Sequence, residues 1–211
     1  MLPELTVLAA FLLASITLIV LPGPDTFYVA ARSLHQGPMA GLIATLGIQA
    51  GCIVHVTAAA FGISSLFAYA PATLQVIRYA GAIYLLYLAW GTIVGGDSDE
   101  AAAAPLPPMR PWRILWQAAL TNLLNPKVIL FFLAFLPQFA RPDAGPVWLQ
   151  MASLGAIFLV LGATYLVTVA AIAGSIGTRL RRHTTFRRAQ RWITGTTLGG
   201  LAIWLAVADR R

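Results

Sequence analysis

The sequence has few charged residues: only 10% of its 211 residues are Asp, Glu, Lys or Arg, whereas 59% are hydrophobic. An ordinary soluble domain carries about 25% charged and about 45–50% apolar residues. The scarcity of charge therefore excludes a soluble globular protein. It predicts an all-α integral membrane protein, in which the long uncharged runs cross the bilayer as helices of roughly 20 residues.

Cysteine and the common catalytic motifs are almost absent. Cys52 is the only cysteine, so no intramolecular disulfide can form, and its apolar surroundings favour a small packing residue. We find neither a Cys/His cluster with metal-ligand spacing nor a Walker-type glycine loop. The sequence thus predicts no metal site, no cofactor and no enzyme, and any transport it performs would draw on an ion gradient or on the substrate gradient.

The first 20 residues also lack positive charge, since they contain Glu4 but no Lys or Arg. A cleaved signal peptide has a basic segment before its apolar core. We therefore expect this segment to stay in the protein as the first membrane span.

The net charge of +7 comes largely from one place, because six of the fourteen basic residues lie between positions 179 and 191. Nucleic-acid binding needs a soluble basic face, and this segment lies between two apolar runs. It is typical of a loop that faces the cytoplasm and its anionic lipids. The charge pattern predicts a lipid bilayer as partner and no nucleic acid.

Six apolar stretches follow one another, and a polar segment rich in Ala and Pro, residues 96–111, separates the third from the fourth. This divides the chain into a first three-helix unit, residues 1–95, the linker, and a second three-helix unit, residues 112–211. The expected spans are 4–34, 38–66, 71–95, 112–139, 146–177 and 190–208.

The first span of each half is interrupted by proline beside an ionisable residue, in LPGPDT (21–26) and in NLLNPKVIL (122–130). Since each half has three spans, the two halves have opposite orientations in the membrane. Paired broken helices in such an inverted repeat mark the binding site of many transporters. Two ordinary proline kinks with charges at the membrane interface are the alternative.

The residues at the first interruption can bind groups of both charges. A helix that restarts at Pro24 exposes free N–H groups and the positive end of its dipole, which suit a carboxylate, while Asp25 can accept an ammonium group. Lys127 either holds the carboxylate of the substrate or neutralises Asp25. The structural alternatives are that Asp25 caps the helix and that Lys127 reaches the interface or forms a fixed salt bridge. Charge inside a span is expensive, which favours function.

Other polar residues lie within the spans. His55 either relays protons, because its unperturbed pKa is near 6.5, or packs as a hydrogen-bonded side chain. Gln49, Asn122 and Asn125 either line the same cavity or bond neighbouring helices.

Three pairs of glycines have the GxxxG spacing of close helix contacts: Gly47 with Gly51, Gly91 with Gly95, and Gly195 with Gly199. Such contacts form within the chain or between two copies in a homodimer.

Three segments in order resemble the LysE/RhtB superfamily of bacterial amino-acid exporters: LPGPDTFYVAARSLHQGPMAGLIATLGIQAGCIVHV (21–56), RYAGAIYLLYLAWGTI (78–93) and TNLLNPKVILFFLAFLPQF (121–139). The resemblance implies a secondary exporter of amino acids in the inner membrane, driven by the proton-motive force. It also implies that the Pro-Gly-Pro and Asn-Pro-Lys segments bind the substrate. The positions concerned are Pro22, Gly23, Pro24, Asp25, Asn122, Asn125, Pro126 and Lys127.

The sequence therefore predicts six transmembrane helices arranged as two inverted repeats, with access alternating around Asp25 and Lys127. The expected substrate is a small neutral or basic amino acid. An exporter of a metal ion or another small solute is the alternative within transport, and a membrane scaffold is the alternative outside it.

Overall fold

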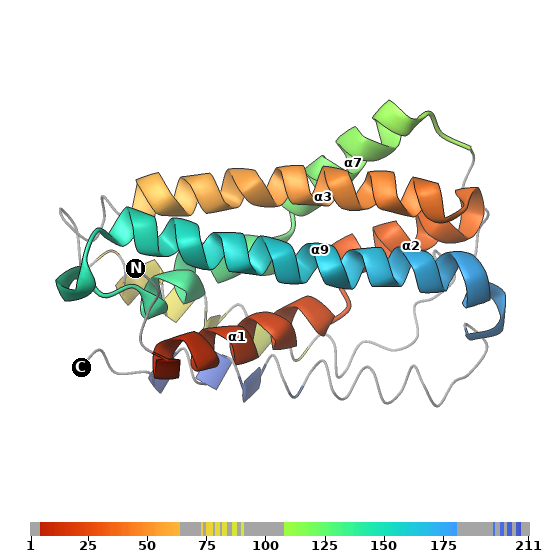
Figure 1. Ribbon diagram of the computed structural model, residues 1–211. Helices are drawn as coiled ribbons and strands as arrows, with labels where there is room; N and C mark the ends of the chain where they lie inside the picture. The colour runs from red at the N-terminus through yellow and green to blue at the C-terminus, as the bar shows by residue number, and fades with distance from the viewer. Residues whose placement is uncertain are drawn as a thin grey trace.

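The computed structural model (Figure 1) describes residues 5–63 and 108–180 continuously, together with single positions within 73–90 and 196–207. Every element that these residues form is helical. The prediction of an all-α protein is therefore confirmed for the part of the chain that the structure describes.

The first predicted span is broken. Helix α1 (Leu5–Val20) ends before Pro22, and helix α2 (Pro24–Gln36) starts with Pro24 at its first position, at an angle of 49° to α1. A proline disfavours helical geometry in the residue before it and lacks the N–H that a helix interior needs. At the first position of a helix that N–H is not required. Residues 21–23, called the first break below, therefore separate two helices.

The fourth predicted span is broken in the same way. Helix α7 (Pro111–Leu123) is followed by α8 (Pro126–Leu130), which continues as the π-helix η2 (Phe131–Phe135) and the 3-10 helix η3 (Leu136–Phe139). The two segments meet at 48°, and Pro126 is again the first helical residue. Residues 124–125 are the second break. Both predicted interruptions are confirmed.

Two long helices run side by side through the molecule (Figure 1). Helix α3 (Pro38–Ala58) continues as the π-helix η1 (Ala59–Ile63), and after the short 3-10 turn η4 (Pro142–Ala144), α9 covers Val147–Leu180. Both are long and apolar enough to cross a membrane, and each bent pair passes the same test if its two helices count as one span. The described residues thus contain two to four candidate spans.

Glycines set the spacing between α3 and α7. A Cβ atom on Gly47 would overlap the carbonyl oxygen of Leu115, and one on Gly51 would come within 2.8 Å of the carbonyl oxygen of Ala119. Small residues allow helices in lipid to approach this closely. The first GxxxG pair therefore serves a contact within the chain.

Aromatic side chains fill the interior beside the second break. Phe131 stacks on Phe135 and on Phe158 of α9, and Phe11 of α1 packs edge-on against Phe139. Both π-helical segments, η1 and η2, border this cluster. The cluster joins α1, α9 and the helices after the second break into one core.

Several predictions concern residues outside the continuous description. These are the third and sixth spans, the linker up to residue 107, two of the GxxxG pairs, and the basic segment from residue 181 onward. The six-helix inverted repeat and the division into three units stay predictions.

Candidate functional site

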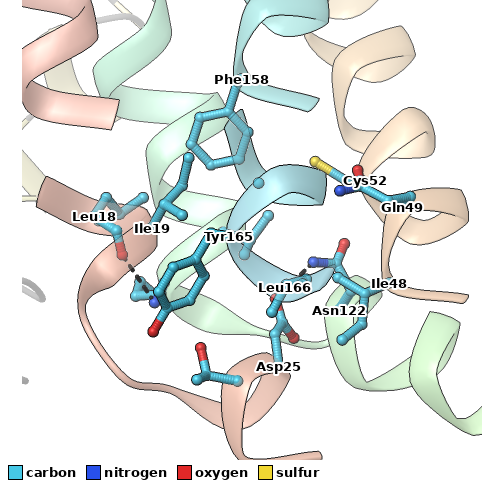
Figure 2. A pocket seen from close by; sticks show the side chains of 14 residues that line it. Leu18, Ile19, Asp25, Ile48, Gln49, Cys52, Asn122, Phe158, Tyr165 and Leu166 are labelled. Atoms are coloured by element: carbon cyan, nitrogen blue, oxygen red, sulfur yellow. Dashed lines mark hydrogen bonds between the residues drawn. The ribbon is translucent and has the colours of Figure 1, made fainter. Parts of the chain in front are cut away.

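The two breaks border one cavity of about 50 Å³, which is large enough for a few water molecules. Residues from α1, α2, α3, α7, α8 and α9 line it (Figure 2). Its wall is mostly apolar. The polar side chains in it are Asp25, Thr26, Gln49, Asn122, Lys127 and Tyr165.

Asp25 is the second residue of α2 and is 9% exposed. Its Oδ2 accepts a hydrogen bond from Asn122 Nδ2 at 2.8 Å, whereas its buried Oδ1 has no partner of standard hydrogen-bond geometry among the described residues, although the side-chain amide of Asn125 also lies near this carboxylate. Buried polar atoms in proteins are rarely left without a partner. A ligand or a water molecule in the cavity that bonds Oδ1 would share this carboxylate with the two asparagine side chains. The N-cap of α2 is Gly23, so the alternative that Asp25 caps the helix is wrong.

Lys127 is the only lysine in the chain, and it lies in the first turn of α8. Its Nζ donates to the carbonyl oxygens of Leu21 at 2.7 Å and of Leu18 at 3.1 Å. The Leu18 carbonyl lies in the last turn of α1 and Leu21 directly follows that helix, where the last acceptors are left unbonded and carry partial negative charge. Lys127 thus uses two of its three N–H donors on the other half of the chain.

Asp25 and Lys127 line the same cavity, but the described residues show no ion pair between them within 4.0 Å. The alternative of a fixed salt bridge is therefore wrong for this pair. Each charged group instead bonds the end of the helix before the other break. Asp25 bonds Asn122 in the last turn of α7, and Lys127 bonds the carbonyls at the end of α1. The bond of Asp25 and the bonds of Lys127 therefore both join the first half of the sequence to the second.

The two asparagines differ in their roles. Asn122 is 2% exposed, lines the cavity and bonds Asp25, while its Oδ1 has no hydrogen-bond partner. Asn125 is 1% exposed, and its Oδ1 accepts from the backbone N–H of Lys127 at 3.1 Å, which caps α8. Asn125 does not line the cavity, and its buried Nδ2, which has no partner of standard hydrogen-bond geometry among the described residues, belongs to an amide that lies near the Asp25 carboxylate.

The prolines and Gly23 shape the breaks and do not line the cavity. A Cβ atom on Gly23 would lie 3.2 Å from Lys127 Nζ. Gly23 therefore leaves the room that the ammonium group occupies beside the end of α1. Pro22, Pro24 and Pro126 set where the helices end and start and do not contact the cavity.

His55 also lies outside the cavity wall. Its Nε2 is 3.3 Å from the backbone oxygen of Asn122, and its ring stacks on Phe132 with 5.9 Å between the centroids. Asn122 therefore lies between His55, which contacts its backbone, and Asp25, which contacts its side chain. The role of His55 as a proton relay stays a prediction.

Helix α9 contributes cavity residues that the sequence did not reveal. Phe158, Gly162, Tyr165 and Leu166 lie on one face of this helix at intervals of four, three and one. Tyr165 also donates to the carbonyl oxygen of Val20 at 3.3 Å. A helix that is apolar on every side gives no periodic signal for the face that lines a cavity. The one available signal was Tyr165, the only tyrosine in this apolar run.

Comparison with known proteins relates the chain to transporters. Residues 16–209 match the LysE type translocator family. An uncharacterized membrane protein of Pseudomonas aeruginosa is 32% identical over 202 residues, which cover 92% of this chain and 89% of that protein. The leucine efflux protein of Salmonella typhimurium is 31% identical over 129 residues, which cover 61% of each chain. No solved structure matches the chain.

The family match covers most of the chain, and the two breaks and the cavity between them lie within it. Members of this family are transporters, which agrees with the prediction that the chain is not an enzyme. This protein is a multi-pass membrane protein and belongs to the LysE type translocator family.

Proposed function

We propose that the protein exports small amino acids from the bacterial cytoplasm across the inner membrane, as a secondary transporter that alternates access around the cavity between the two breaks. The observation that carries the proposal is that a buried carboxylate, Asp25, and an ammonium group, Lys127, line the same cavity without forming an ion pair with each other among the described residues. A free amino acid carries one charge of each sign. The cavity offers a partner for both.

The substrate ammonium binds Asp25 Oδ1, which has no hydrogen-bond partner among the described residues. The substrate carboxylate binds at the start of α2, where Gly23 provides no side-chain cap for the first N–H groups. The positive end of the helix dipole favours an anion there. Lys127 supplies the positive charge beside it with its remaining N–H donor.

The same contacts couple binding to movement. In the described conformation Lys127 holds the last carbonyls of α1. A substrate carboxylate competes with those carbonyls for the ammonium group, because charge-assisted hydrogen bonds are stronger than bonds to neutral acceptors. Substrate binding thereby loosens α1 from α8, and the two halves change their relative tilt, as proposed for inverted-repeat transporters.

Proton coupling uses the contact chain from His55 through Asn122 to Asp25. Protonation of His55 alters the charge near the carboxylate that holds the substrate ammonium, which makes binding depend on the proton gradient. Similarity to the leucine efflux proteins supports an amino acid as the substrate. The full architecture in this proposal is six spans in two inverted three-helix repeats, residues 1–95 and 112–211, joined by the linker 96–111.

The decisive experiment measures efflux from cells that are loaded with single amino acids by feeding dipeptides. The variant Asp25→Asn keeps an oxygen that can accept from Asn122 but removes the negative charge. We expect it to abolish efflux, whereas the matched variant Asp143→Asn, at a position whose side chain is 71% exposed, leaves efflux unchanged. Both are compared at equal protein in the membrane.

Efflux that is faster with the protein than without it, and that stops when the proton gradient is collapsed, supports the exporter and its energy source. No difference for any amino acid contradicts the proposal and favours another solute or a scaffold role. Normal efflux by Asp25→Asn contradicts the site while leaving the exporter intact.

A further inference from the structure

The two prolines of the first break remove hydrogen bonds from the end of α1. A helical carbonyl accepts from the N–H four residues later. For Leu18 that position is Pro22, which has no N–H. For Val20 it is Pro24. Both carbonyl oxygens therefore lack a helical donor, and within a membrane they need another partner.

Side chains from the second half of the sequence supply the missing donors. Lys127 Nζ donates to the carbonyl oxygens of Leu18 at 3.1 Å and of Leu21 at 2.7 Å. The bond to Leu18 is the dashed line beside that label in Figure 2. Tyr165 donates to the neighbouring Val20 oxygen at 3.3 Å. A positive charge thus bonds two backbone oxygens at the negative end of a helix.

The oxygens that bind Lys127 have the chemistry of a site for a monovalent metal ion. Carbonyls at interrupted helices coordinate Na⁺ in secondary transporters, and rings of carbonyls replace the water around K⁺ in channels. The Asp25 carboxylate lines the same cavity and adds negative charge. Gly23 leaves room for a cation, since a Cβ atom there would lie 3.2 Å from Lys127 Nζ. The ammonium group therefore occupies the place that such an ion would take.

We propose that the end of α1 is a binding site for a monovalent cation, and that Lys127 fills it as a cation built into the chain. Transport by the wild-type protein then requires neither Na⁺ nor K⁺. Without the lysine side chain the site takes up Na⁺ or K⁺ from solution, and the bound ion restores the positive charge beside the substrate carboxylate. This inference rests on the proposed export of amino acids.

Two variants separate an empty site from a blocked one. Lys127→Ala removes the side chain beyond Cβ and leaves its space to an ion. Lys127→Met also removes the charge, but it keeps a side chain of similar length in the site. The experiment measures efflux of a preloaded amino acid from proteoliposomes under an imposed proton gradient, with chloride salts of Na⁺, K⁺ or choline at equal concentration on both sides. Choline is the reference cation because it has no N–H to donate to the carbonyls.

We expect the wild-type rate to be equal in the three salts. Lys127→Ala should be inactive in choline and at least about tenfold faster in Na⁺ or in K⁺, the factor that one contact to a charged group contributes. Lys127→Met should stay inactive in every salt. Since both variants retain Asp25, this difference assigns the ion to the place of the ammonium group and not to the carboxylate.

Thermal unfolding of the purified proteins in detergent tests the same site without transport. A ligand that binds only the folded state stabilises it. Na⁺ or K⁺ should therefore raise the melting temperature of Lys127→Ala above its value in choline and leave the wild-type protein and Lys127→Met unchanged.

The absence of any salt effect on Lys127→Ala, in both rate and melting temperature, overturns the inference and leaves the exporter standing. An equal gain in Lys127→Met overturns it too, and so does a wild-type rate that depends on Na⁺ or K⁺, whatever the variants do. No transport of any amino acid by the wild-type protein overturns the proposed function, and the melting temperatures then decide the cation site alone.

Discussion

The two breaks bend their helices by nearly the same angle, 49° and 48°, but treat the start of the second helix differently. At the second break the Asn125 side chain caps α8. At the first break Gly23 provides no side-chain cap for α2. The start of α2 can therefore accept an anion from the cavity, whereas the start of α8 already has an acceptor. Under the proposed function, equivalent positions would therefore provide one anion site instead of two.

The C-terminal ends of α1 and α7, which precede the two breaks, resemble each other more closely. The last carbonyls of α1 accept from Lys127 and Tyr165, and the carbonyl of Asn122 in α7 lies beside His55. A carbonyl that is freed within a membrane needs a partner from the protein or from cavity water. Both breaks are therefore stabilised by side chains from other helices.

The largest expected effect is at the ammonium group that joins the breaks. Lys127→Met removes two charge-assisted hydrogen bonds, each of about 1.5–3 kcal/mol, and leaves the end of α1 without its donor. We expect efflux per protein to fall at least about 100-fold, since 1.36 kcal/mol corresponds to a factor of ten. Initial efflux rates, normalised to protein in the membrane, measure this. Arg141→Met, at an exposed cation, is the control, and wild-type rates in Lys127→Met would contradict the role.

A smaller effect is expected at Gly23, where the first break lies against Lys127. Gly23→Ala pushes the ammonium group by a few tenths of an ångström, because the new Cβ would lie 3.2 Å from Nζ. Its bonds to α1 lengthen, and we expect a loss of efflux of about threefold to tenfold, equivalent to about one neutral hydrogen bond. The same assay measures it. Gly62→Ala, where the new Cβ would have no described atom within 4 Å, should have no effect, and an equal loss in both variants would argue against a specific contact.

The smallest effect is expected at the cap of the second break. Asn125→Ala removes the acceptor for the Lys127 N–H and should destabilise the protein by about 1 kcal/mol. Thermal unfolding of the purified protein in detergent measures the change. Asn125→Ser keeps a neutral oxygen at the cap and should retain more of the wild-type stability than Asn125→Ala. If both variants are equally destabilised, the cap is not what Asn125 contributes.

The breaks were predictable from the sequence because proline and glycine act on their own stretch of backbone. LPGPDT and NLLNPK contain the residues that end one helix and start the next, and the structure breaks at both. The long helices α3 and α9 follow equally directly from their uncharged runs.

The partners of the charged groups were not predictable. Lys127 binds backbone carbonyls, and a backbone carbonyl has no signature in the sequence. The apolar wall of the cavity comes from a face of α9 that nothing distinguishes from its other faces.

Asp25 and Lys127 each follow the proline that restarts a helix, so they occupy matching places with opposite charge. Two copies of the first half, joined as the halves are here, would bring a carboxylate toward the carbonyls that Lys127 binds, and both groups are negative. Two copies of the second half would leave ammonium groups without a carboxylate in the cavity. The two breaks are complementary in charge, and in the proposed repeat each half would need the other rather than a second copy of itself.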